Sequence, residues 1–363
     1  MASTVKWPAK NTAFLLIHGN GPKREYETLD NFTRTFKDVL QNPQVEHRLG
    51  DRRQGCIRFN RPSHSYIDFY EYYWDRFMVR EIQAKELKDF LKEIYDRIKD
   101  REFSPRNYHI PFFLSLFRSP PLLGSILTNV QFTKKRMIEY AKDVPIYCLH
   151  NQRSKYSDIR ENLLSGAVGE LIGLLESPED YKQIIVVGHS LGSVIAYDAL
   201  NRIARDLSSS SPSLDDTQAQ NIRGLVTFGS FLDMVAFFFE AEKHVPKENC
   251  IERQIAVERH CFRTPAARSE SNPIDYSKLD KVKWVNFYHP DDFVANQPLI
   301  SYELDENDQM LCNKKGGKAG ELTRWEWLQY KIPFVKSWKR HMDAHGSYWK
   351  DENMYQKIAE TFF

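Results

Sequence analysis

The sequence predicts an α/β fold, in which a mainly parallel β-sheet carries helices on both faces. Short apolar runs, such as AFLLI at 13–17 and the IIVV of 183–187, end at or near glycines, and helical periodicity returns between such runs. A continuous apolar run indicates a strand that is covered on both faces, as in parallel sheets. Strands that alternate with helices over most of a chain favour a parallel sheet with helices on either side.

The elements follow one another along the whole chain. The run 13–17 and the aromatic-rich stretch 66–74 are predicted to be strands. Apolar residues recur every three or four positions over 80–99, which predicts an amphipathic helix. A second helix is predicted over 158–176, with Asp158 as its N-cap and Ser177-Pro178 ending it. The remaining predicted elements are a strand at 183–187, a helix at about 191–206, and strands at 223–230 and 282–288.

We expect a single domain over residues 1–363, because a chain of this length can bury one large core. Two stretches, 103–143 and 231–280, are rich in apolar residues and are predicted to be cap or lid insertions, although additional core would have the same composition. The segment 208–220 is poor in apolar residues and is predicted to be a mobile surface loop.

Composition and charge exclude several classes of protein. The formal net charge of +2 gives no reason to expect a nucleic-acid partner. The window 110–132 is the most apolar one, but Arg118, Pro120 and Pro121 interrupt it too often for a membrane-spanning helix. It is instead a candidate for peripheral membrane contact. The N-terminal residues show no signal-peptide pattern, so we expect a cytoplasmic protein.

No metal or other cofactor is expected from the sequence. The five cysteines are widely spread and never form a C-x-x-C pair, which argues against a zinc cluster or a disulfide framework. His341 and His345 have the i, i+4 spacing of metal ligands, with Asp343 between them. The glutamate of the H-E-x-x-H pattern is absent and Gly346 follows directly, so a metal site is not the preferred interpretation.

The pentapeptide Gly188-His189-Ser190-Leu191-Gly192 is the most informative motif. It has the pattern G-x-S-x-G between a β-branched strand and a predicted helix, the context that gives the pattern its meaning. A serine on such a tight turn has a strained backbone and an exposed hydroxyl, while glycines on either side leave room for the turn. The helix starts here, so backbone N–H groups beginning with that of Leu191 point to where an oxyanion would form.

These residues resemble the α/β-hydrolase family, especially its lipase and esterase branch, whose elbow often reads Gly-His-Ser-Leu-Gly. The stretch FLLIHGNG at 14–21 is similar to the strand and His-Gly turn that carries the second oxyanion-hole amide in this family. By position the resemblance assigns that amide to Asn20, with Gly21 as the alternative.

The family order of Ser, then Asp or Glu, then His requires both partners of Ser190 to follow it in the chain. The resemblance implies Asp292 as the acid, in the pattern Asp292-Phe293-Val294, with Asp291 and Asp233 as alternatives. It implies His345 as the base, in a His-x-x-Tyr-Trp motif eighteen residues from the C-terminus, with His341 as its rival.

The sequence therefore predicts a serine-dependent carboxylic ester hydrolase. Ser190 is the expected nucleophile, His345 the base and Asp292 the acid, and the amides of Asn20 and Leu191 are expected to form the oxyanion hole. The expected substrate is a small-molecule or lipid ester. A thioesterase, amidase, acyltransferase or peripheral phospholipase would keep the same triad, and a catalytically silent hydrolase-fold binding module is an alternative of another class.

Overall fold

The computed structural model describes the sheet, the helices beside it and the segments that join them. The residues described are 5–20, 24–49, 55–62, 64–78, 143, 147, 157–209, 212–232, 279, 281–292, 294–295, 299, 308–310 and 343–363. The predicted helix at 80–99, the window 110–132 and nearly all of the two predicted insertions lie outside them. So do Gly21, Asp233 and His341.

Eight strands form one sheet in the order β2-β3-β4-β1-β5-β6-β7-β8. All neighbours from β4 to β8 pair in parallel, whereas β3 is antiparallel to both β2 and β4. The strands are β1 (Thr12–Ile17), β2 (Gln44–Leu49), β3 (Gly55–Asn60), β4 (Ile67–Tyr72), β5 (Gln183–His189), β6 (Ile222–Phe228), β7 (Lys283–Tyr288) and β8 (Asp308–Met310). The prediction of an α/β fold with a mainly parallel sheet is thus confirmed.

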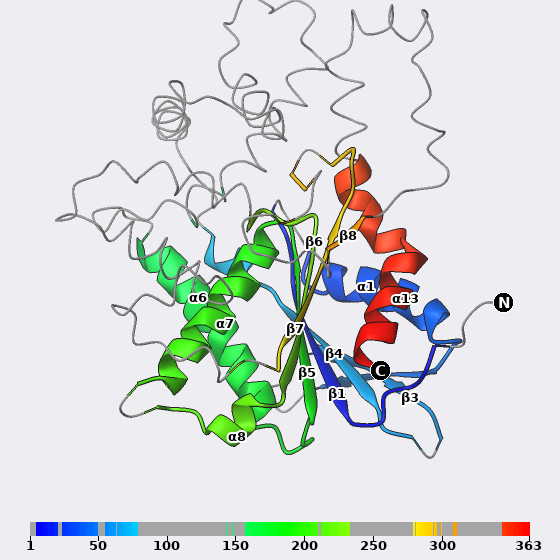
Figure 1. Cartoon of the computed structure of the whole chain (residues 1–363), viewed down its shortest axis with the longest axis horizontal. Helices are drawn as coiled ribbons and strands as arrows, with labels where there is room; N and C mark the ends of the chain where they lie inside the picture. Colours follow the sequence, from blue (N-terminus) through cyan, green and yellow to red (C-terminus); the bar gives the residue numbers. More distant parts are fainter. Residues whose placement is uncertain are drawn as a thin grey trace, which may run out of the picture.

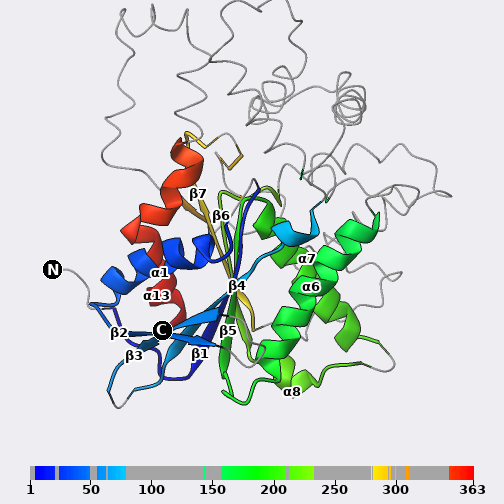
Figure 2. The same cartoon turned by 180° about the vertical axis from the view of Figure 1, so that it is seen from behind.

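Helices cover both faces of this sheet. In Figure 1, α6 (Ser157–Leu175) and α7 (Leu191–Leu207) lie on the left of the sheet, and α1 (Glu27–Val39) and α13 (Glu352–Phe362) lie on the right. Figure 2 shows the same two layers from behind. The shorter helices are α8 (Asp216–Ala219) and the 3₁₀ turns η1 (Asp75–Phe77) and η9 (Tyr348–Lys350). No helix in the described ranges is long and apolar enough to cross a membrane.

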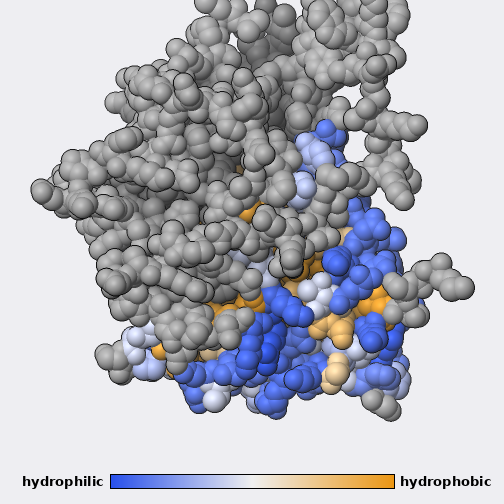
Figure 3. All heavy atoms as spheres, in the orientation of Figure 1, coloured by the Kyte–Doolittle hydropathy of each residue, from blue (hydrophilic) through white to orange (hydrophobic). Residues whose placement is uncertain are grey.

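Successive side chains of β1 point to opposite faces of the sheet, which explains why the core has two halves. Ala13, Leu15 and Ile17 belong to the cluster that includes the buried residues of α6 and α7. Phe14 and Leu16 point the other way and belong to the cluster formed with α1 and α13. Every residue of β1 is buried, as expected for a strand in the middle of a covered sheet. The described surface in the lower part of Figure 3 is largely hydrophilic, with smaller apolar patches.

Several boundaries and elements differ from the sequence prediction. The strand predicted at 183–187 continues through His189, so that Ser190 directly follows β5 and α7 begins at Leu191. The helix predicted to be capped by Asp158 begins one residue earlier, and Asp158 lies in its first turn. The sequence analysis did not predict α1, β2, β3 or β8.

The segment 208–220 was predicted to be a mobile loop, and this is wrong for its second half. It contains α8, whose N-cap Asp215 accepts a hydrogen bond from the backbone N–H of Thr217 at 2.9 Å. Leu214 and Ala219 are both buried. Two well-placed apolar side chains and a capping aspartate therefore anchor the segment, although its overall composition is polar.

Candidate active site

The site lies where the strand order reverses. β1 and β5 are neighbours, but the chain continues from β1 toward β4 on one side and from β5 to β6 on the other. In open α/β sheets, ligands bind in the crevice outside the carboxyl ends of the strands at such a point. The His18-Gly19-Asn20 turn follows β1 and Ser190 follows β5, so both predicted parts of the site lie at this crevice.

Ser190 has a strained backbone. Its φ of 53° and ψ of −124° place a residue with a side chain in a region that non-glycine residues rarely adopt. The Ser190 N–H donates to the carbonyl of Phe228 at 3.1 Å, and the Ser190 carbonyl accepts from the N–H of Ser193 at 3.0 Å. Hydrogen bonds on both sides of the residue thus fix this turn between β5 and α7.

Two glycines of the pentapeptide are required by close approach. A Cβ on Gly192 would lie 2.2 Å from the carbonyl oxygen of Ile17, and a Cβ on Gly188 would lie 2.5 Å from Cα of Ser193. Both contacts involve backbone atoms, which cannot rotate away. The missing side chain at Gly192 therefore lets the first turn of α7 pack against the end of β1, and the missing side chain at Gly188 lets the same turn pack against the end of β5.

The turn after β1 touches the serine itself. A Cβ on Gly19 would lie 2.7 Å from Cβ of Ser190 and 2.8 Å from Nδ1 of His189. Asn20, the predicted second oxyanion donor, follows directly and is buried. Leu191, the other predicted donor, is the first residue of α7 and is fully buried. The structure thus brings the two predicted oxyanion segments to the same serine.

Trp74, two residues after β4, supports the turn that follows β1. Its indole N–H donates to the carbonyl of His18 at 2.8 Å, and its backbone N–H donates to Nε2 of His18 at 3.2 Å. The two rings are stacked with centroids 4.5 Å apart. Because Nε2 accepts, Nδ1 carries the proton that it shares with the Gly19 carbonyl at 2.8 Å. The sequence analysis placed His18 in the His-Gly turn but did not predict its contacts with Trp74.

Glu71 caps α1 from the neighbouring strand. The N-cap residue Tyr26 has a φ of 68° and makes no side-chain cap, while Oε2 of Glu71 accepts from the N–H of Leu29 at 3.1 Å. Burial raises the pKa of this carboxyl to about 7, against the lowering effect of the Leu29 and Thr28 hydrogen bonds. The helix that follows the turn with Gly19 is thereby tied to β4.

The predicted acid and base are in direct contact. Nδ1 of His345 lies 3.0 Å from Oδ1 and 2.9 Å from Oδ2 of Asp292. The Val294 N–H donates to Oδ1 at 2.8 Å, and the Tyr348 hydroxyl donates to Oδ2 at 2.9 Å. Asp291, the alternative acid, is half-exposed, and its backbone N–H bonds to Nδ1 of His289. The structure therefore brings Asp292 to His345.

The Asp292 carboxyl is fully buried, yet it is held in its charged form. Burial alone would raise its pKa, but the neighbouring His345 and the donors from Val294 and Tyr348 outweigh this effect and hold the pKa below its usual range. Burial and the Asp292 charge raise the pKa of Tyr348 well above its usual value, so the phenol keeps its proton. An imidazole that donates from Nδ1 to a carboxylate has its basic lone pair on Nε2.

Further contacts link the Asp292–His345 pair to the serine turn. Phe228 accepts from the Ser190 N–H, and Gly229, with a φ of +55°, follows it. A Cβ on Gly229 would lie 3.0 Å from Cε1 of His345. On the other side of Ser190, Nε2 of His189 lies 3.2 Å from the His345 carbonyl, to which it donates. The serine and the imidazole are therefore both anchored at the end of β6.

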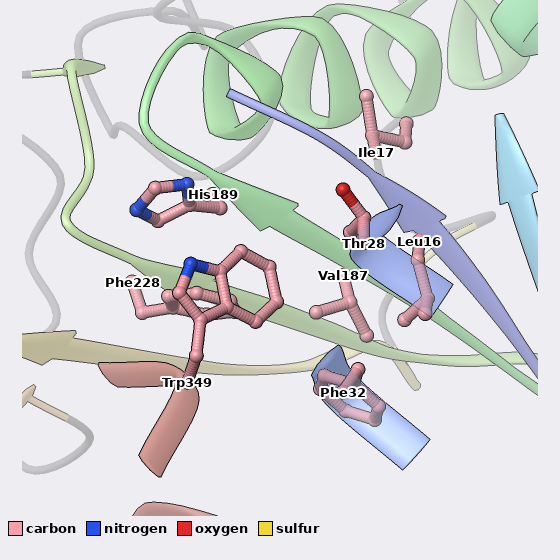
Figure 4. Close-up of a pocket in the computed structure, with 8 residues that line it drawn as sticks. All are labelled: Leu16, Ile17, Thr28, Phe32, Val187, His189, Phe228 and Trp349. Atoms are coloured by element: carbon pink, nitrogen blue, oxygen red, sulfur yellow. The ribbon is translucent and has the colours of Figure 1, made fainter. Parts of the chain in front are cut away.

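A narrow, mainly apolar crevice, too small to hold a water molecule, lies next to this anchor. Figure 4 shows the His189 ring at the end of β5 facing the indole of Trp349 from η9, and the ring centroids are 5.0 Å apart. The other lining residues are Leu16, Ile17, Thr28, Phe32, Val187 and Phe228. Their apolar character makes this crevice a packing feature behind the serine turn.

Among the residues that the structure describes, no cluster of three metal-ligating side chains is present. Nδ1 of His345, one member of the spacing considered for a metal, is in contact with Asp292, and Asp343 is exposed.

No model of a known protein family matches the sequence, and no curated protein is significantly similar to it. The chemistry of the site has to be inferred from its own geometry.

Proposed function

We propose that the protein is a serine-dependent carboxylic ester hydrolase with the α/β-hydrolase fold. One observation carries this proposal: a buried Asp292–His345 pair is anchored beside a serine with a strained backbone, at the carboxyl edge of a parallel sheet. The order of Ser190, Asp292 and His345 along the chain, and the His-Gly turn against the serine, are those of the α/β-hydrolases.

The proposed reaction is a two-step acyl transfer. Nε2 of His345 takes the hydroxyl proton of Ser190 as the oxygen attacks the ester carbonyl. The N–H groups of Leu191 and Asn20 stabilise the oxyanion of the tetrahedral intermediate. His345 then returns the proton to the leaving alcohol, which departs as the ester bond breaks.

Water completes the cycle by the same route. It loses a proton to His345 as it attacks the acyl-enzyme carbonyl, and His345 returns that proton to the Ser190 oxygen as the acyl–serine bond breaks and the carboxylic acid leaves. Asp292 holds the imidazole in the tautomer with the proton on Nδ1 and stabilises its positive charge during both steps. No part of this scheme calls for a metal or another cofactor.

For the substrate we propose a small-molecule or lipid ester. The basis is the apolar composition of 103–143 and 231–280, which as lids would favour medium or long acyl chains. Contact of 110–132 with a membrane surface belongs to the same proposal, as does a cytoplasmic location.

Covalent labelling tests the nucleophile without knowledge of the substrate. A fluorophosphonate should label the wild-type protein, and the adduct should map to Ser190. Ser190→Ala should abolish labelling and lower turnover of p-nitrophenyl esters by roughly 10⁴- to 10⁶-fold. Ser208→Ala is the matched control, because Ser208 lies at the opposite end of α7, where its hydroxyl donates to the Ala204 carbonyl.

The outcomes separate the proposed class from its alternatives. Comparison of acetyl to palmitoyl esters with matched thioesters and amides distinguishes an esterase from a thioesterase or amidase. Transfer of the acyl group to an added alcohol in preference to water would identify an acyltransferase. A wild-type protein that is neither labelled nor active on any of these substrates would contradict the proposal and favour a silent binding module.

A further inference from the structure

Tyr348 makes a contact for which the proposed reaction has not yet accounted. Its hydroxyl donates to Oδ2 of Asp292 at 2.9 Å, the same oxygen that lies 2.9 Å from Nδ1 of His345. Its side chain is fully buried, and the ring packs against Phe228 with centroids 5.7 Å apart. The phenol and the imidazole therefore share one carboxylate oxygen that is buried.

The position of Tyr348 is fixed from several sides. It begins η9, three residues after His345, so one short segment carries both groups that bond to Asp292. At the next residue, the Trp349 carbonyl accepts from the hydroxyl of Thr35 in α1 at 2.7 Å. The ring of Tyr348 lies against Gly229, where a Cβ would come within 3.1 Å of its Cε2. The hydroxyl is thus held on the carboxylate by packing.

We propose that Tyr348 is a positioning residue that tunes the basicity of His345 through Asp292. A hydrogen bond donated to a carboxylate spreads its negative charge and weakens its attraction for a neighbouring cation. With the phenol in place, Asp292 stabilises the imidazolium form of His345 less strongly than an unshared carboxylate would. Removal of the phenol should therefore strengthen the attraction between Asp292 and the protonated imidazole.

Other ionisable groups lie near the Asp292–His345 pair, and a test of Tyr348 has to leave these groups unchanged. His289 and Asp291 lie on the loop that carries Asp292, and Asp291 is half-exposed. His189, from the end of β5, has its ring centroid 4.9 Å from that of His345. A substitution that removes only the oxygen of Tyr348 leaves all three in place.

Tyr348→Phe tests the proposal, which rests on the proposed hydrolase function for its kinetic readout. We expect the acid limb of the kcat/KM profile to move to higher pH by about half a unit or more. We expect kcat to fall by about tenfold while KM changes little, because the hydroxyl touches the acid rather than the substrate. An unchanged acid limb in a folded Tyr348→Phe protein would overturn the proposal.

Tyr72→Phe is the matched control. Tyr72 is equally buried, and its hydroxyl donates at 2.6 Å to the Leu163 carbonyl in α6, an uncharged acceptor. Its loss should lower stability by a similar amount and leave the acid limb where it is. A shift of the same size in both variants would show that loosened packing moves the limb, which also contradicts the proposal.

A second variant covers the case in which Tyr348→Phe does not fold. Incorporation of 3-fluorotyrosine at 348 makes the phenol a stronger donor with almost the same shape. The acid limb should then move to lower pH, opposite to the Phe variant. No shift, or a shift to higher pH, would refute the tuning role.

The pKa of His345, measured by NMR of the ring nitrogens, separates this proposal from the proposed function. It should rise in Tyr348→Phe relative to wild type, whether or not the protein turns over an ester. Failure of Ser190 to react with the fluorophosphonate would contradict the hydrolase reaction alone. An unchanged His345 pKa would contradict the role of Tyr348 alone.

Discussion

Gly19→Ala is the sharpest test of the way the oxyanion turn meets the nucleophile. The added methyl would lie 2.7 Å from Cβ of Ser190, 2.8 Å from Nδ1 of His189 and 3.1 Å from the His189 carbonyl oxygen. Ordinary contacts begin at 3.4 Å, so Ser190 Cβ and the turn would have to separate by about 0.7 Å. None of these atoms is the free end of a flexible side chain.

The size of the loss in activity depends on which of the two turns can move to make room for the methyl group. The serine turn cannot recede easily, because Gly192 already touches the Ile17 carbonyl and the Ser190 N–H is bonded to Phe228. The turn with Gly19 must therefore shift, and Asn20 shifts with it. A misplacement approaching 1 Å lowers a catalytic rate by up to about 100-fold, and overpacking costs about 1–3 kcal/mol of stability.

We therefore expect kcat/KM on a p-nitrophenyl ester to fall by about 30- to 100-fold in Gly19→Ala. Thermal unfolding on the same preparation measures the loss of stability. Gly169→Ala in α6 is the control, because the added methyl meets no atom within 4 Å. It should leave activity unchanged and stabilise the helix by up to about 1 kcal/mol. A folded Gly19→Ala protein with activity within threefold of wild type would refute the close approach.

Three further predictions follow from the same contacts. Asp292→Asn should lower kcat, measured by steady-state kinetics, by about 10⁴-fold. The amide would neither hold the His345 proton on Nδ1 nor supply a negative charge for the imidazolium. Trp74→Phe removes the donor to the His18 carbonyl and should slow fluorophosphonate labelling by about tenfold. Burial raises the pKa of Glu71 from 4.5 to about 7, so the native state keeps a proton that the unfolded chain loses. Stability should therefore fall by about 3 kcal/mol as pH rises through this interval, and Glu71→Gln should flatten that part of the Tm profile.

The elements that the sequence predicted correctly can be recognised from the composition or periodicity of their own residues. The apolar run of β5, the glycines around Ser190 and the periodicity of α7 are neighbours in the chain, and each predicts the next. The core strands β1, β6 and β7 have buried side chains on both faces, so their composition alone identifies them. Boundaries were accurate to one or two residues for these elements.

The elements that were missed lack such signals or depend on distant partners. β2 is an edge strand whose residues are almost all exposed, so its sequence shows no alternation of apolar and polar residues. The apolar stripe of α1, Leu29, Phe32 and Phe36, has helical spacing and could have been recognised. Its cap could not, because Glu71 comes from a strand 42 residues away.

Asp292 was chosen over Asp291 because the pattern Asp292-Phe293-Val294 resembles that of the α/β-hydrolases. The structure adds a contact that this choice did not include: the Val294 N–H donates to Oδ1 of Asp292 at 2.8 Å. The Tyr348 hydroxyl donates to Oδ2, and Nδ1 of His345 lies 3.0 Å from Oδ1 and 2.9 Å from Oδ2. Tyr348 belongs to the His-x-x-Tyr-Trp motif, but the motif does not show that its hydroxyl bonds to Asp292, 56 residues away in the chain.

The layout of the site explains why so few segments suffice to hold it. Three neighbouring strands, β1, β5 and β6, deliver the oxyanion turn, the serine and the glycine against the imidazole from the same edge of the sheet. Close approaches at Gly19, Gly192 and Gly229 leave little room between these segments: Gly192 meets the backbone of β1, Gly19 meets Ser190 and His189, and Gly229 meets the rings of His345 and Tyr348. Only the Asp292–His345 pair comes from outside these strands. Its carboxylate is held by two further hydrogen-bond donors, the Val294 N–H and the Tyr348 hydroxyl. Perturbations of the glycines should therefore act on geometry, whereas perturbations of Tyr348 should act on the charge of the base.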